Sequence, residues 1–343
     1  MVHDANRQYR WTAWVFWMVS GAAIATPQPD QCAKIPDDAS RLTCYDNALR
    51  TDPSPVIDSN VGVEDTTMPA SSWLDKAWEL TPADKRGTFI VKTHLPNFVL
   101  PVHVTSRINR LPASPTHPAG PVDGHYVSTE GKFQISLKTK VYEGLLLPNA
   151  DLWFAYTQRS LWQVWNKKDS APFRSTDYEP EMVYVVPMSE RMPALPAQWR
   201  WRMVQWGLVH QSNGQSNALS RSWNRTYVGA AFDHGPFAVS LRVHHRFKEG
   251  GSDDNPDLTN YLGAGEITGA WIDGPQALIL TWRTNFKSTH RGSLQLDWTH
   301  AVHSDKPTGL RWYVQLFSGY GETLLDYNHR QNSLGVGVTV FQF

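Results

Sequence analysis

Apolar and polar side chains alternate along many segments of this chain after residue 87. In residues 132–141, Phe133, Ile135 and Leu137 share one face of an extended backbone, and lysine, glutamine or serine occupies the positions between them. Alternation with period two predicts β-strands that carry one apolar and one polar face. The same pattern recurs in four further segments: residues 237–244, 276–286, 291–300 and 310–318.

The alternating segments predict an all-β domain. Candidate strands begin near Phe89, Lys132, Asp151, Glu179, Trp199, Ser222, Pro236, Asn260, Gln276, Arg291, Leu310 and Leu334. A soluble β-sandwich would also alternate, because its apolar faces pack against each other. A membrane barrel is favoured by strands of about ten residues, by aromatic residues near the strand ends and by polar faces suited to a lumen. The segment from Leu334 to Phe343 also resembles the C-terminal strand of bacterial outer-membrane proteins. We therefore expect a transmembrane antiparallel β-barrel of about twelve strands over residues 87–343.

The N-terminus has the composition of a secretory signal peptide. Arg7 and Arg10 precede the apolar run from Trp11 to Ile24, and Ala23-Ile24-Ala25 provides a small-residue cleavage pattern. We expect residues 1–25 to be removed on export. An uncleaved anchor is the alternative, but the apolar run is short for one.

Residues 26–86 form the expected N-terminal extension, which we place in the periplasm. Cys32 and Cys44 lie twelve residues apart, and an exported protein meets an oxidising compartment, so a disulfide between them is expected. From Thr51 to Leu80 the chain is rich in Pro, Ser, Thr and Asp without a sustained period, which resembles a solvated linker or a plug-like extension.

Composition narrows the class of function. The 343 residues carry 32 Lys+Arg and 32 Asp+Glu, so no basic surface for nucleic acid is implied. Charged residues make up 19% and aromatic residues 12%, with 16 tryptophans. After the N-terminal run, no stretch of about 18 apolar residues could cross a bilayer as a helix.

Candidate chemistry lies in the hairpin around residues 206–224. On the incoming strand, His210 and Ser212 share a face with Trp206 and Leu208; on the outgoing strand, Asn224 shares the lipid-side face. A serine nucleophile needs an imidazole base and a third group that fixes the imidazole tautomer, and this spacing can supply all three. Alternatively, these residues only lie at the headgroup level, where polar side chains are tolerated.

At this hairpin the sequence resembles the outer membrane phospholipase A family, over roughly Asp151 to Phe343. The resemblance rests on long motifs in the same order: residues 156–163, 170–180, 210–225, 253–257 and 318–328. It implies a twelve-stranded barrel and calcium-dependent hydrolysis of phospholipid acyl esters by a homodimer at the outer membrane.

Carried over by position, the resemblance implies that Ser212 is the nucleophile, His210 the general base and Asn224 the residue that orients it. Ca²⁺ would be held by the Ser220 hydroxyl and the Gln215 carbonyl, with Ser170 of the partner subunit completing the site.

Further positions follow from the same resemblance. Asp254 matches a position associated with calcium in the monomer, and Gln158 matches a polar residue of the dimer interface. Asn217 stands where an acidic residue is common, which removes a charge from the monomeric site. Two other functions remain open: an inert barrel or passive pore, and a lipopolysaccharide acyl-ester hydrolase.

Overall fold

The computed structural model describes residues 32–49, 72–119, 122, 124–169, 172–288, 290–306 and 308–341. The chain divides into two compact units, Met1–Met68 and Pro69–Phe343. In the first, Cys32 forms the expected disulfide with Cys44 of helix α2 (Asp38–Leu49), and the two Cα atoms are 5.5 Å apart. The expected signal peptide, residues 1–25, lies outside the described residues.

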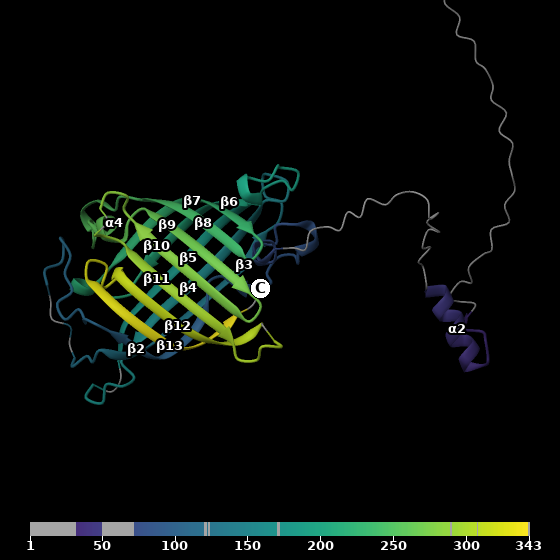
Figure 1. Ribbon diagram of the computed structural model, residues 1–343, viewed down its shortest axis with the longest axis horizontal. Coiled ribbons are helices and arrows are strands. Elements are labelled where there is room, and N and C mark those ends of the chain that lie inside the picture. Colours follow the sequence, from purple (N-terminus) through teal and green to yellow (C-terminus); the bar gives the residue numbers. More distant parts are fainter. Residues whose placement is uncertain are drawn as a thin grey trace, which may run out of the picture. The chain divides into compact units, whose positions relative to one another are not determined.

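The second unit is a closed antiparallel barrel of twelve long strands, whose slanted arrangement is visible in Figure 1. The long strands are β2 (Asn97–Thr105), β3 (Thr129–Tyr142), β4 (Asp151–Trp162), β5 (Phe173–Pro187), β6 (Arg200–Ser212), β7 (Ser222–His234), β8 (Phe237–Arg246), β9 (Gly265–Asp273), β10 (Gln276–Thr284), β11 (Ser293–Ala301), β12 (Gly309–Tyr320) and β13 (Arg330–Phe341). Each pairs with its neighbours in sequence, and β13 pairs with β2 to close the barrel. The expected fold is confirmed.

Short elements accompany the barrel. Strand β1 (Val91–Thr93) pairs with β3, and the helices are α3 (Trp73–Trp78) and α4 (Leu258–Leu262). Single 3₁₀ turns lie at η1 (Pro82–Asp84), η2 (Pro196–Gln198), η3 (Asn217–Leu219) and η4 (Gly250–Ser252). Among the described residues, no helix is long and apolar enough to cross a bilayer.

Some predicted strand starts were wrong. The strand expected near Glu179 begins already at Phe173, and the strand expected near Leu334 begins at Arg330. The strand expected near Phe89 is interrupted before β2, because Pro96 has no amide hydrogen to continue the ladder. The strand expected near Asn260 begins only at Gly265. Its first part is helix α4 because Leu258 and Leu262, four residues apart, are both buried in one cluster with Leu324 and Tyr327.

The two faces of the strands separate as the alternation predicts. Ile135 and Leu137 are 47% and 40% exposed on the outer surface of β3, whereas Lys132, Lys138 and Lys140 are buried inside the barrel. An apolar exterior and a charged interior suit a protein whose solvent is lipid. This distribution excludes the soluble sandwich, in which the apolar faces would be the buried ones.

Long connections lie at one end of the barrel, which we call the loop end. They are residues 106–128, 163–172, 213–221, 247–264, 285–292 and 321–329. Outer-membrane barrels carry their longer loops on the extracellular side, so the expected location in the outer membrane would place the loop end outward and the opposite end at the periplasm.

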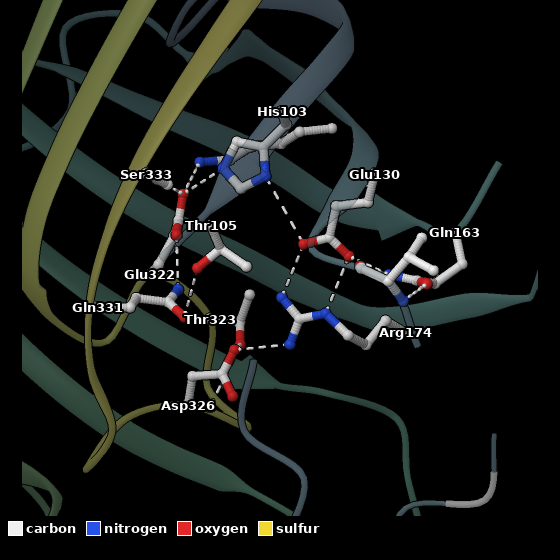
Figure 2. Close-up of polar contacts among 12 residues, drawn as sticks. His103, Thr105, Glu130, Gln163, Arg174, Glu322, Thr323, Asp326, Gln331 and Ser333 are labelled. Atoms are coloured by element: carbon white, nitrogen blue, oxygen red, sulfur yellow. Dashed lines mark hydrogen bonds and ion pairs between the residues drawn. The ribbon is translucent and has the colours of Figure 1, made fainter. Parts of the chain in front are cut away.

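Ion pairs fill the lumen near the loop end, as Figure 2 shows. Arg174 donates two hydrogen bonds to Glu130, both 2.9 Å, and a third of 2.9 Å to Asp326. His103 Nε2 lies 2.8 Å from Glu322 Oε1, which also accepts a 2.7 Å hydrogen bond from Lys132. These groups come from β2, β3, β5 and residues 321–329, so the network joins distant strands across the interior.

Helix α3 closes the opposite end. Its N-terminus has a capping box in which Ser72 and Asp75 exchange hydrogen bonds, and Leu74 and Trp78 are buried against Trp153 and other apolar barrel residues. Residues 72–80 therefore follow the plug-like alternative and not the solvated linker. A cavity of about 310 Å³ remains inside the barrel.

Candidate active site

The candidate catalytic side chains lie on the outer face of β6 and β7, close to the loop end. The strands pair with His210 opposite Asn224 and Ser212 opposite Ser222. His210 shares its face with Trp206 and Leu208, which are 47% and 40% exposed. A polar group here therefore stands at the upper edge of the lipid-facing surface.

His210 and Asn224 form a hydrogen bond across the two strands. The imidazole Nδ1 lies 2.8 Å from Asn224 Oδ1. An amide oxygen can only accept, so this contact requires the hydrogen of a neutral imidazole to be on Nδ1. The lone pair of Nε2 is then available to act as a base.

Ser212 follows His210 by two residues on the same face of β6 and is half-buried. Its backbone pairs with Tyr178 of β5 on the other side. Within the described part of the chain, its hydroxyl forms no hydrogen bond. The structure thus places the three residues of the expected triad on one surface and joins two of them directly.

The carboxylate of Glu249 contacts the expected triad through Asn224. The carboxylate of Glu249 accepts hydrogen bonds from Asn224 Nδ2, at 2.9 Å, and from the Asn224 amide nitrogen, at 3.1 Å. Sequence reasoning missed Glu249, since it is separated from Asn224 by 25 residues and no motif connects the two.

Asn213 holds the hairpin loop that follows Ser212. Its buried side chain donates to the Leu219 carbonyl at 2.7 Å and accepts from the amides of Arg221 at 3.0 Å and Gln215 at 3.3 Å. The next residue, Gly214, has φ of 61°, and a Cβ there would lie 2.9 Å from the Tyr178 ring. Residues 213–221 therefore have a fixed shape, and this loop carries two of the expected calcium ligands.

The expected calcium ligands are partly brought together. Ser220 Oγ donates a 2.5 Å hydrogen bond to Asp254 Oδ2, whereas Gln215 lies exposed on the same loop as Ser220. Ser170 lies outside the described residues. Ca²⁺ prefers neutral and anionic oxygen donors, and a hydroxyl in contact with a carboxylate fits that preference. No cluster of three or more His, Cys, Asp or Glu side chains suited to a metal occurs in the described ranges.

Asp254 has further contacts that sequence reasoning did not indicate. Ser114 Oγ donates a 2.5 Å hydrogen bond to the Asp254 carbonyl, and His117 Nε2 lies 3.7 Å from its carboxylate. These residues come from the loop after β2, some 140 positions earlier. Their contacts join the loop after β2 to Asp254, whose carboxylate is hydrogen-bonded to Ser220.

Tyr327 supports the same layer of loops. Its hydroxyl donates a 2.5 Å hydrogen bond to Asp257, and the buried Arg221 guanidinium lies 5.9 Å from its ring. Burial raises the pKa of the Tyr327 hydroxyl, and the hydrogen bond to Asp257 raises it further. The phenol therefore remains a donor and ties residues 321–329 to residues 253–257.

Gln158 is the expected interface residue, and it lies half-buried on β4. Its Oε1 accepts a 3.2 Å hydrogen bond from Tyr156 two residues earlier on the same face. Phe154 continues this face and is 40% exposed. A carboxamide among lipid-facing aromatic residues is costly unless it is hydrogen-bonded.

Comparison with known proteins identifies the family of this chain. The phospholipase A1 family model matches residues 74–340. A relative from Neisseria meningitidis serogroup B is 34% identical over 353 residues, covering 90% of this chain and 89% of that protein. The fold matches outer membrane phospholipase A from Escherichia coli at a TM-score of 0.63 and 32% identity, covering 74% of this chain and 94% of that one.

A second solved structure is similar. It is the Salmonella typhi outer membrane phospholipase dimer with bound calcium, matched at a TM-score of 0.66 and 32% identity over 78% of this chain and 97% of that one. This chain therefore belongs to the phospholipase A1 family and is an outer-membrane β-barrel phospholipase.

Proposed function

We propose that the protein hydrolyses acyl ester bonds of glycerophospholipids with Ser212 as nucleophile, His210 as general base and Asn224 as the group that orients the imidazole. The observation that carries this proposal is the 2.8 Å contact between His210 Nδ1 and Asn224 Oδ1 on the lipid-facing side of the barrel. An acyl ester of a membrane lipid approaches from that side, so the substrate and the triad meet without leaving the bilayer surface.

The first chemical step is acylation. Ser212 Oγ attacks the ester carbonyl while its proton passes to His210 Nε2, and a tetrahedral oxyanion forms. The Asn224 oxygen accepts from Nδ1 and stabilises the imidazolium. Collapse of the intermediate breaks the ester C–O bond, and His210 returns the proton to the departing glycerol oxygen. This departing alcohol is the lysophospholipid. Water then attacks the acyl-enzyme by the same proton transfers, breaks the bond to Ser212 Oγ and releases the fatty acid.

The proposed calcium ligands are the Ser220 hydroxyl and the Gln215 carbonyl of one subunit with Ser170 of the partner subunit, and Asp254 in the monomer. When bound, Ca²⁺ supplies positive charge that stabilises the oxyanion. Asn213 supports this arrangement because its three hydrogen bonds fix the loop that carries Gln215 and Ser220.

The active species is proposed to be a homodimer. A relative of known structure is a dimer with bound calcium. The Gln158 side chain, which lies among outward aromatic residues of β4, supports the same assembly, because a second copy offers hydrogen-bond partners that lipid does not.

The test uses purified protein in detergent micelles with a defined diacyl phospholipid. Release of fatty acid in Ca²⁺, its loss in EDTA and its loss in Ser212→Ala are the expected results. A matched Ser240→Ala variant, changed inside the lumen, is expected to retain activity. Calcium-independent hydrolysis, or hydrolysis by Ser212→Ala, would contradict the proposal.

A further inference from the structure

The Asn224 side chain is hydrogen-bonded at both ends of its amide. On one side, Oδ1 lies 2.8 Å from His210 Nδ1; on the other, Nδ2 donates to Glu249 Oε1 at 2.9 Å. The same carboxylate oxygen accepts from the Asn224 backbone nitrogen at 3.1 Å. One residue from outside the triad therefore contacts the orienting residue twice.

Strand pairing brings Glu249 to this place. Strand β8 ends at Arg246, opposite Arg225, and the Phe247 amide adds one more hydrogen bond of 2.9 Å to the Asn224 carbonyl. The chain then turns into η4, with Glu249 as the residue before the turn. Glu249 is half-buried, so its carboxylate is partly shielded from water beside Asn224.

The chemistry of a carboxylate decides how Asn224 can be oriented. An ionised carboxylate only accepts hydrogen bonds, so the donor end of the amide must face Glu249. The acceptor end then faces His210, which requires hydrogen on Nδ1 and leaves Nε2 free. With the amide rotated by 180°, the Asn224 oxygen would meet the carboxylate, and its NH₂ group would oppose the imidazole.

We propose that Glu249 is a positioning residue that fixes the orientation of the Asn224 amide and, through it, the tautomer of His210 in which Nε2 can accept the Ser212 proton. The inference rests on the proposed function of the triad and adds a residue to it. The negative charge that serine hydrolases commonly place next to the histidine lies here one residue further away, behind a neutral amide. This explains why a neutral residue is suitable at position 224: an aspartate there would face Glu249 directly.

The experiment is a double-mutant cycle between positions 224 and 249, with kcat and KM measured on a defined phospholipid in micelles with Ca²⁺. Glu249→Leu is expected to lower kcat about tenfold with KM unchanged, because leucine has a similar size but cannot accept a hydrogen bond. Glu249→Gln keeps an acceptor and is expected to retain most activity. In the Asn224→Ala background, Glu249→Leu should have no further effect, since the amide it acts through is absent.

A charge exchange provides a second readout. Asn224→Asp alone should have a low kcat because two carboxylates then face each other. Asn224→Asp combined with Glu249→Gln should have a kcat at least about fivefold higher than Asn224→Asp alone, since glutamine can donate a hydrogen bond to the aspartate. Glu190→Leu, an exposed acid at the periplasmic end, is the matched control and should leave kcat unchanged. Heat-modifiable gel mobility reports that each barrel is folded.

Two results would overturn the inference. One is an equal decrease in kcat when Glu249→Leu is introduced into the wild type and into Asn224→Ala, which is the result that a merely structural role would give. The other is no rescue of Asn224→Asp by Glu249→Gln. Neither outcome contradicts the proposed triad, which is tested separately: activity retained by Ser212→Ala would contradict it.

Discussion

His210 and Asn224 face each other across β6 and β7, with 2.8 Å between the imidazole Nδ1 and the amide Oδ1. The two residues would contribute unequally to hydrolysis. In the proposed mechanism, His210 takes the proton, whereas Asn224 only orients the ring and supports its charge.

His210→Ala is therefore expected to lower kcat by about 10³-fold or more, and Asn224→Ala by about 10²-fold or less. Fatty acid release from a defined phospholipid measures both. His234→Ala, an exposed histidine at the periplasmic end, should keep wild-type activity. Equal losses for Asn224→Ala and His210→Ala would mean that Asn224 does more than orient.

Calcium removal should dissociate the active species. Because Ca²⁺ and substrate bind the dimer better than the monomer in our account, linkage requires both to favour dimerisation. EDTA is expected to give inactive monomers, and Ca²⁺ with a slowly hydrolysed acyl analogue should restore dimers in analytical ultracentrifugation.

Ser220→Leu tests the ligands directly, because it removes a hydroxyl that contacts Asp254. It should weaken both calcium binding and dimer formation. Full activity in EDTA, or an active species that sediments as a monomer, would contradict the calcium-dependent dimer.

Trp78 anchors helix α3 in the barrel. It is 7% exposed, its ring packs edge-on against Trp153 at 5.8 Å, and Lys138 Nζ lies 3.3 Å from its centroid. Trp78→Ala should cost about 3–5 kcal/mol in the free energy of unfolding, measured by urea titration in detergent. Leu146→Ala, at an exposed loop position, should change it little. An unchanged urea midpoint of unfolding for Trp78→Ala would show that the packing of helix α3 in the barrel adds no stability.

The side chains that obstruct both ends of the lumen predict an absence of conductance. Arg174, Glu130 and Asp326 form ion pairs near the loop end, and α3 closes the other end. A barrel of twelve strands has little open space once such side chains fill it. Planar bilayers containing the protein should therefore pass no steady current. Stable single-channel steps from the wild type would support the passive pore instead.

The sequence predicted those features that depend on local pattern. Period-two alternation was sufficient for the outward position of Ile135 and the inward position of Lys138, because neighbours on a strand always point to opposite faces. The same reasoning placed His210, Ser212 and Asn224 on one face. Segment 258–262 was misread because a buried helical turn and a short strand contain similar apolar residues.

Contacts between distant segments could not be predicted. Glu249 contacts Asn224 only because the pairing of β7 with β8 ends at Arg225 and Arg246, next to Asn224 and shortly before Glu249. Trp78 lies in a segment whose composition resembles a linker, and its burial depends on a barrel mouth formed by residues about 75 to 160 positions later. The proposed roles of the expected calcium ligands followed from resemblance to the family alone, since hydroxyl and carbonyl donors carry no charge that a sequence pattern could indicate.

The central claim is that Ser212 performs calcium-dependent ester hydrolysis at the membrane surface. The most direct measurement compares fatty acid release from one defined phospholipid by wild-type protein and Ser212→Ala, both folded, at saturating Ca²⁺. Our account predicts release by the wild type and a loss of nearly all release by Ser212→Ala. Retention of most phospholipase activity by Ser212→Ala would contradict it.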